Sequence, residues 1–370
     1  MALIIGRLTI AWATVVLFLI FGDSWLTDLS STLRSSMLFV WLFAVILWCA
    51  SGVVKEADHL AELLGEPIGT LVLTLSIVIV EVVLIAAVVF GSEAASTLGR
   101  DTMFAVLMIV LNGVVGLALL LGGWRHREQA YNLQGAVAYL AVIIPLSVIA
   151  LVLPNFTQAE PVGSLTTTQA AFFSVFTIAL YGIFLMIQTG RHRLFFVDSL
   201  KECEVADDGN TKIERHGSAG RAIGGHTCLL VLTMLPIVLL AKQLAMLIDH
   251  GIVVLGAPPA LGGVLIALII FTPEAIVALR AALDNQLQQS INLCLGASAS
   301  TIGLTVPAIL GVGIITGKTM VLGLDPAGMT LLALTLLLCS LTFSGPRTTV
   351  LEGAGHLVIF LVYIVLIFSP

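Results

Sequence analysis

Long apolar runs constrain the fold of this 370-residue chain more than any other feature. A helix needs about 20 consecutive apolar residues to cross the hydrocarbon core of a bilayer. Such runs recur along the whole chain, and only 10% of its residues are charged, against about 25% in soluble domains. The pattern predicts an all-α polytopic membrane protein with about 11 transmembrane helices. The predicted spans are residues 3–22, 34–53, 67–90, 102–121, 135–153, 168–189, 223–246, 257–281, 290–312, 326–345 and 350–368.

The basic residues are distributed unevenly over the ends of these spans. With a cytoplasmic N-terminus, 12 of the 16 Lys and Arg residues fall at ends that face the cytoplasm, and four fall at ends that face outside. The four outside are Arg34, Arg100, Lys242 and Lys318. Under the positive-inside rule, this bias places the N-terminus and the polar loop over 190–222 in the cytoplasm and the C-terminus outside.

Two stretches half a chain apart share one pattern. A glycine, eleven mostly apolar residues and a glutamate occupy 69–81 and again 262–274. The two glutamates are 193 residues apart, and the similar segments LGEPI (64–68) and LGAPPA (255–260) precede them. Because the third span runs outward and the eighth inward in the predicted topology, we interpret the two halves as an inverted repeat, with a chance match of apolar segments as the alternative. Inverted repeats with a site near the bilayer midplane are typical of secondary transporters.

The repeated glutamates, Glu81 and Glu274, lie near the middle of their predicted spans. An ionised side chain there costs about 2.5–3.5 kcal/mol or more, so two at matching positions favour a function, and we expect both to face one hydrated cavity. Carboxylate oxygens suit hard cations such as Ca²⁺ and Na⁺. Two carboxylates close together also retain a proton near neutral pH, so cation and proton compete for the same oxygens. Ca²⁺ matches the charge of both carboxylates, whereas Na⁺ neutralises only one.

Three further side chains are candidate neutral ligands of such a cation. Ser298 and Ser300 belong to the segment GASASTIG at 296–303, and Asn112 precedes Gly113 in the fourth span. Their oxygen atoms would complete the coordination of a hard cation. Hydroxyls and small residues also form ordinary packing contacts between membrane helices, and this is the alternative interpretation.

Two other sets of charged residues lie near span ends. Glu352, at the start of the last span, is a candidate for a supporting role, and an ion pair with Arg347 is its simplest interpretation. An acidic patch precedes the third span on the predicted cytoplasmic side. Its members are Glu56, Asp58, Glu62 and Glu66. The patch would concentrate cations at an entrance, and a solvated loop is the alternative.

Three segments carry a resemblance to a known family: residues 58–86, residues 255–308 and GPRTTVLEGAGH at 345–356. They resemble the calcium/proton antiporter branch of the calcium/cation antiporter superfamily, and among its members the bacterial calcium, sodium or potassium/proton antiporters. The resemblance implies two inverted five-helix repeats after an extra first helix. It also implies that one glutamate of each repeat forms the cation and proton site, and by motif position these are Glu81 and Glu274.

The chain departs from that family beside both glutamates. The wider family reads Gly-Asn-Ala-x-Glu in each repeat, whereas IVIV at 77–80 and IFTP at 270–273 stand here. The usual Ser-Ser-Thr-Gln of the second repeat is replaced by ASAS at 297–300. Because the neutral amide is missing from both repeats, Na⁺/H⁺ or K⁺/H⁺ exchange stays open beside Ca²⁺/H⁺ exchange.

We therefore expect a first transmembrane helix in 1–33, an N-terminal repeat half in 34–189, a charged cytoplasmic loop in 190–222 and a C-terminal repeat half in 223–370. The expected function is alternating-access antiport of Ca²⁺, or alternatively Na⁺ or K⁺, against protons across the bacterial inner membrane. We expect no cofactor and no nucleic-acid partner; the surroundings are membrane lipid and the oligomeric state is open. A channel would need a repeated filter, and an enzyme a motif such as HExxH or GxSxG, which the sequence lacks.

Overall fold

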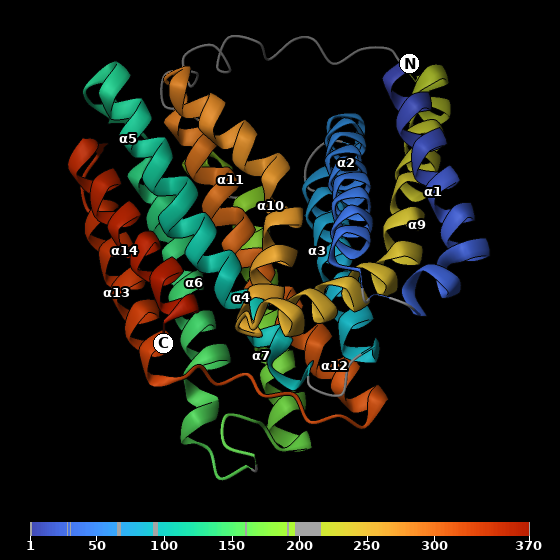
Figure 1. Cartoon of the computed structure of the whole chain (residues 1–370). Helices are drawn as coiled ribbons and strands as arrows, with labels where there is room; N and C mark the ends of the chain where they lie inside the picture. Colours follow the sequence, from blue (N-terminus) through green and yellow to red (C-terminus); the bar gives the residue numbers. More distant parts are fainter. Residues whose placement is uncertain are drawn as a thin grey trace. The chain divides into compact units, whose positions relative to one another are not determined.

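The computed structural model describes residues 2–27, 29, 31–64, 68–91, 95–159, 161–190, 192–196 and 216–369, which are mostly helical (Figure 1). The α-helices are α1 (Ala2–Thr27), α2 (Thr32–Leu64), α3 (Ile68–Gly91), α4 (Leu98–Leu107), α5 (Val115–His126), α6 (Leu133–Leu151), α7 (Thr167–Thr189), α9 (His216–Leu255), α10 (Ala260–Leu283), α11 (Leu287–Ser300), α12 (Val306–Thr316), α13 (Pro326–Thr342) and α14 (Val350–Phe368). Two π-helical turns, η2 (Met108–Val114) and η5 (Thr301–Thr305), join α4 to α5 and α11 to α12. Two short strands, β1 (Gln129–Ala130) and β2 (Arg347–Thr348), follow α5 and α13.

The predicted all-α polytopic fold is confirmed. Among the described residues, nine helices are long and apolar enough to cross a membrane. Two shorter apolar segments are Leu75–Ala86, which is part of α3, and Pro326–Thr342, which is α13. The number of 11 spans stays a prediction. Helices α2 and α9 are longer than predicted, since α2 continues to Leu64 and α9 begins at His216. The predicted charged loop over 190–222 falls largely outside the described residues.

The inverted repeat has a counterpart in the secondary structure. The π-helical turns begin at Met108 and Thr301, which are 193 positions apart, the same separation as the two repeated glutamates. The first residues of α6 and α13, Leu133 and Pro326, are also 193 positions apart. A π-helical turn inside a longer helix is rare. Its recurrence at matching positions therefore supports two related halves. Each half contains five helical rods, where a rod is either a single helix or two helices joined by a π-helical turn.

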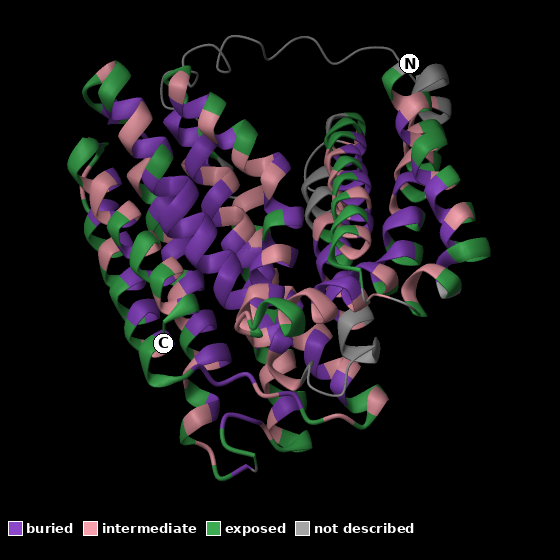
Figure 2. Ribbon diagram, in the orientation of Figure 1, coloured by how far each residue is buried: buried purple, intermediate pink, exposed green. Residues whose placement is uncertain are grey.

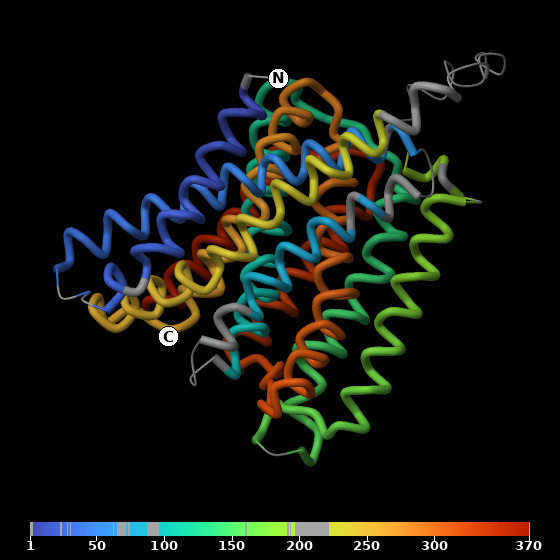
Figure 3. The backbone as a smooth tube through the Cα atoms, turned by 90° about the vertical axis from the view of Figure 1, so that its right-hand side faces the viewer, coloured from blue at the N-terminus to red at the C-terminus, as the bar shows by residue number. Residues whose placement is uncertain are grey.

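The described chain divides into two compact units, and each unit draws on both halves of the sequence. Unit 1 comprises residues 1–102, 216–273 and 315–318. Within it, α2, α3 and α9 pack against one another, and α1 packs against α2 and α9; Figure 3 shows α1, α2 and α9 running side by side. The indole Nε1 of Trp12 on α1 donates to the carbonyl oxygen of Leu232 on α9 at 3.2 Å.

Unit 2 comprises residues 103–215, 274–314 and 319–370. All seven residues of η2 are buried, and Figure 2 shows buried positions along the rod formed by α4, η2 and α5. Within unit 2, α14 packs against α5 and η2, while α7 packs against η5. The third rod of each half therefore contacts the last helix of the other half.

Two backbone pairings in unit 2 also join a loop of one half to a loop of the other half. Strand β1, in the loop from α5 to α6, pairs antiparallel with β2, in the loop from α13 to α14. Ser164, in the loop from α6 to α7, forms an antiparallel bridge with Val321, in the loop from α12 to α13. In both cases, the loop after the third rod of one half meets the loop after the fourth helix of the other half. This reciprocal relation is what a two-fold axis between inverted halves requires.

Tyr131 stabilises the pairing of β1 with β2. Its hydroxyl donates to the carbonyl oxygen of Gly345, beside β2. Burial raises the pKa of Tyr131 to about 12, and the negative charge of Glu352 adds to this effect. The hydroxyl is therefore a neutral donor at physiological pH.

Candidate ion-binding site

Glu81 lies at the middle of α3 and is fully buried. Helix α3 packs against α2 and α9 within unit 1, and the neighbouring side chains on α3 are apolar, among them the buried Val78, Leu84 and Ile85. An ionised carboxylate in such surroundings costs several kcal/mol unless hydrogen bonds or a positive charge offset this cost. A bound cation or a proton provides this compensation. The position therefore suits a group that holds either of the two.

Glu274 lies on α10 directly after Pro273 and belongs to unit 2, whereas Glu81 belongs to unit 1. Its side chain is half-buried. Proline has no N–H to donate, so the carbonyl oxygen of Ile269 lacks its usual helical partner one turn before Glu274. Within unit 2, the carboxylate lies within electrostatic reach of the Cys294 thiol on α11.

Helix α11 carries a row of small polar side chains. Ser290, Cys294 and Ser298 follow at intervals of four residues, so they share one helix face, and all three are buried. The Ser298 hydroxyl donates to the carbonyl oxygen of Cys294 at 3.0 Å, and the Ser300 hydroxyl donates to that of Ala297 at 3.0 Å. Each hydroxyl oxygen keeps its lone pairs for a cation. Ser298 shares the face of Cys294, whereas Ser300, two residues further on, lies on another face.

Asn112 lies in η2 and its amide is hydrogen-bonded on both sides. Its Nδ2 donates to Thr335 Oγ1 on α13 at 2.9 Å, and its Oδ1 lies 3.1 Å from His356 Nδ1 on α14. The other ring nitrogen, Nε2, lies 2.9 Å from Thr342 Oγ1. All four side chains are buried. The pattern fits a neutral imidazole that donates from Nδ1 to the amide and accepts at Nε2 from the hydroxyl.

Sequence reasoning did not single out His356, Thr335 or Thr342. A signal was present, since an ionisable side chain inside a predicted span rarely faces lipid and usually has a partner. A fourth missed residue is Thr305, which stands 193 positions after Asn112, in the other π-helical turn. Thr305 is fully buried, and its hydroxyl has no hydrogen-bond partner among the described residues. Thr305 is therefore a further candidate neutral ligand.

The predicted ion pair between Glu352 and Arg347 is wrong. Glu352 Oε2 accepts hydrogen bonds from the backbone nitrogen of Thr349 at 2.9 Å and from its hydroxyl, which closes a capping box at the start of α14. Arg347 instead pairs with Glu128 on the exposed surface, with an N–O distance of 2.9 Å. The first turn of a helix leaves backbone N–H groups without partners, and a carboxylate at this position can accept a hydrogen bond from one of these groups. A role of Glu352 in transport stays a prediction.

The acidic patch before the third span is not a solvated loop, because Glu56 and Asp58 lie on the last turns of α2. Glu56 is buried, forms an ion pair with Arg7 and is hydrogen-bonded to His226, so it cannot attract cations to an exposed entrance. The sequence indicated the charge of Glu56 but not its partners, which stand 49 and 170 positions away. The side chain of Glu62 and the whole of Glu66 lie outside the described residues.

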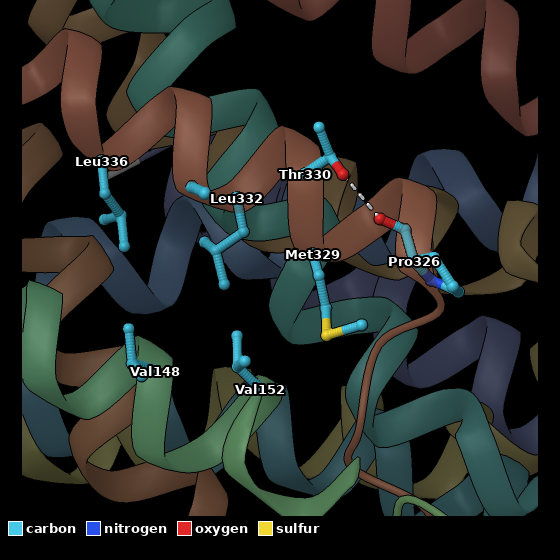
Figure 4. A pocket seen from close by; sticks show the side chains of 8 residues that line it. Val148, Val152, Pro326, Met329, Thr330, Leu332 and Leu336 are labelled. Carbon is cyan, nitrogen blue, oxygen red and sulfur yellow. Dashed lines mark hydrogen bonds between the residues drawn. The ribbon is translucent and has the colours of Figure 1, made fainter. Parts of the chain in front are cut away.

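An apolar groove of about 560 Å³ lies between α6 and α13 in unit 2 (Figure 4). Its lining includes Val148, Met329 and Leu336, and the hydroxyl of Thr330 donates to the carbonyl oxygen of Pro326 at 2.8 Å. No charged side chain is among the described residues that line it. Because a hard cation needs several oxygen ligands, this groove is not the ion site.

A membrane fold of two inverted halves, with a glutamate within the second helix of each half, defines the class of secondary ion transporters. Residues 34–190 and 225–369 match the family described as sodium/calcium exchanger protein, and the chain belongs to this family. The protein is therefore an integral membrane transporter and not an enzyme.

Two curated relatives and one solved structure extend this assignment. The sodium-potassium/proton antiporter ChaA of Escherichia coli (strain K12) is 39% identical over 325 residues, which cover 88% of this chain and 87% of that protein. The Ca(2+)/H(+) antiporter of Aphanothece halophytica is 23% identical over 263 residues, which cover 67% of this chain and 68% of that protein. The solved structure of native YfkE aligns with a TM-score of 0.73 over 98% of this chain and 100% of that chain, at 17% identity. This last likeness shows a shared fold.

Proposed function

We propose that this chain exchanges a cation against protons across the bacterial inner membrane, with Glu81 and Glu274 as the groups that bind both. The observation that carries this proposal is the complete burial of Glu81 at the middle of α3. An ionisable carboxyl group at such a depth is rare and marks a candidate site for proton and cation binding. The repeat supports Glu274 as its counterpart, because it stands at the matching position of the second half.

In the proposed cycle, the two carboxylates bind protons when no cation is present. A cation that enters from one side displaces these protons, and alternating access then exposes the loaded site to the other side, where protons displace the cation. Ser298 is the favoured neutral ligand near Glu274, because it shares the α11 face of Cys294 and that thiol lies within electrostatic reach of Glu274. Asn112 is the less favoured ligand, since its amide oxygen is 3.1 Å from His356.

Ca²⁺ is the proposed cation, because two carboxylates match its charge. The Aphanothece halophytica relative is named as a Ca(2+)/H(+) antiporter, which supports this choice. Na⁺ and K⁺ are the second candidates. The more similar Escherichia coli relative is named as a sodium-potassium/proton antiporter, and neither glutamate of this chain is preceded by the amide that would add an oxygen ligand for Ca²⁺.

Everted membrane vesicles from cells that lack their own antiporters test the function directly. The lumen is acidified by respiration, and proton release is followed with a pH-sensitive dye after Ca²⁺, Na⁺ or K⁺ is added separately. We expect release on addition of Ca²⁺, and we expect Glu81→Gln and Glu274→Gln to reduce it at least about a hundredfold, because each removes a charge that the cation needs. Glu128→Gln is the matched control, since it removes an exposed carboxylate.

The outcomes separate the two parts of the proposal. Release with Na⁺ or K⁺ but not with Ca²⁺ would keep the mechanism and assign the second candidate cations. Near-normal exchange in either glutamine variant would contradict the role of that carboxylate. No release with any cation from correctly inserted protein would contradict cation/proton exchange itself.

A further inference from the structure

A carboxylate buried in unit 1 joins three helices. Glu56 of α2 is 2% exposed. Its Oε1 lies 3.5 Å from Nη2 of Arg7 on α1, and its Oε2 lies 2.8 Å from Nδ1 of His226 on α9. We call these residues the Arg7–Glu56–His226 cluster. None of them belongs to the proposed ion-binding site.

Gly52 makes room for the arginine of this cluster. It stands one turn before Glu56 on α2, and a Cβ atom at this position would lie only 2.1 Å from Cζ of Arg7. The guanidinium group therefore rests directly against the backbone of α2, and Arg7 is only 6% exposed. A buried charge destabilises a protein strongly when its partner is absent. The pairing with Glu56 therefore fixes α1 to α2.

His226 is the member of the cluster whose ring can bind or release a proton. Its side chain is 31% exposed, and the ring centroid of His59 lies 5.3 Å from its own. Since Nδ1 bonds the Glu56 carboxylate, Nδ1 carries a hydrogen in both protonation states and Nε2 is the atom that gains or loses the proton. Protonation therefore converts a neutral hydrogen bond between α2 and α9 into a stronger, charge-assisted one.

Few other charged side chains lie on the helices around His226, and Glu56 is the buried carboxylate that is bonded to its ring. Among the described side chains, α1 contributes only Arg7, and α9 contributes no other charged residue before Lys242. Helix α2 adds three exposed residues near the cluster, and α3 adds Glu81 at its buried middle. The three on α2 are Lys55, Asp58 and His59.

We propose that Glu56 and His226 form a second proton-binding site, separate from the transport carboxylates, that makes the packing of α2 against α9 depend on cytoplasmic pH. Helix α3, which carries Glu81, packs against both of these helices. The protonated ring strengthens the contact between α2 and α9 and slows exchange, and the neutral ring weakens the contact and permits it. The effect on exchange rests on the proposed function, whereas the effect on stability does not.

Thermal unfolding of the detergent-solubilised protein tests the site without transport. His226→Asn keeps a donor for Glu56 but cannot take up a proton, and His192→Asn removes an exposed histidine as the control. Protonation stabilises the fold, so the extra stability is present at acid pH and lost at alkaline pH. From about pH 6 to about pH 8, we expect the wild type to lose about 2–4 °C more in melting temperature than His226→Asn. The control should behave as the wild type; equal losses in wild type and His226→Asn would overturn the proposal.

Exchange in everted vesicles, whose cytoplasmic face is outward, tests the functional effect. We expect the ratio of rates at about pH 8 and about pH 6 to be about fivefold larger in the wild type than in His226→Asn. The same ratio in wild type, His226→Asn and His192→Asn would exclude control of transport by this site. If no variant exchanged any cation, the proposed function would fail, and the melting comparison would still decide the proton site.

Discussion

A buried polar atom destabilises a protein most when its partner is removed, and His356 illustrates this at the residue scale. Its Nε2 lies 2.9 Å from the Thr342 hydroxyl in a buried network. We predict that Thr342→Val lowers the free energy of unfolding by about 1–3 kcal/mol, because the ring nitrogen is left without a donor. Unfolding in detergent measures this loss.

The matched control for this prediction lies on the same helix. Thr330 is exposed, and its hydroxyl donates to the carbonyl oxygen of Pro326 in its own helix. We expect Thr330→Val to change the free energy of unfolding by less than about 0.5 kcal/mol. Equal losses in the two variants would show that the bond between hydroxyl and imidazole contributes no stability.

At the scale of elements, the contact between α10 and the start of α4 depends on a glycine. A Cβ atom at Gly263 would lie 2.7 Å from the backbone carbon of Asp101 and the backbone nitrogen of Thr102, whereas one at Gly262 would meet nothing closer than 3.5 Å. We predict that Gly263→Ala lowers the melting temperature by at least about 3 °C, because helix backbones must separate. Gly262→Ala should keep or raise it, because alanine favours the helix by about 1 kcal/mol. Equal tolerance of both substitutions would contradict this close approach.

At the scale of the whole molecule, the sequence predicts much of the fold but little of its network of buried polar side chains. Apolar runs identify membrane helices because hydropathy is local, and the spacing of Glu81 and Glu274 predicts the repeat. Neither signal predicts a π-helical turn, which depends on packing around η2 and η5. Partners of buried polar groups also escape sequence reasoning. Asn112 and His356 stand 244 positions apart, and only the tertiary fold joins them. The convergence of the two glutamates on one ion stays a proposal.

The orientation in the membrane is a property of the whole molecule, and both side-chain contacts and the distribution of basic residues predict it. Contacts of Glu56 with Arg7 and His226 bring the start of α1, the end of α2 and the start of α9 to one side of the membrane. The excess of basic residues assigns this side to the cytoplasm. We therefore predict that a periplasmic phosphatase fused after Pro370 is active, while a fluorescent protein fused there stays dark. Fusions within 190–222 should give the opposite result. A fluorescent fusion after Pro370 would place the cluster outside the cell, where cytoplasmic pH could not reach His226.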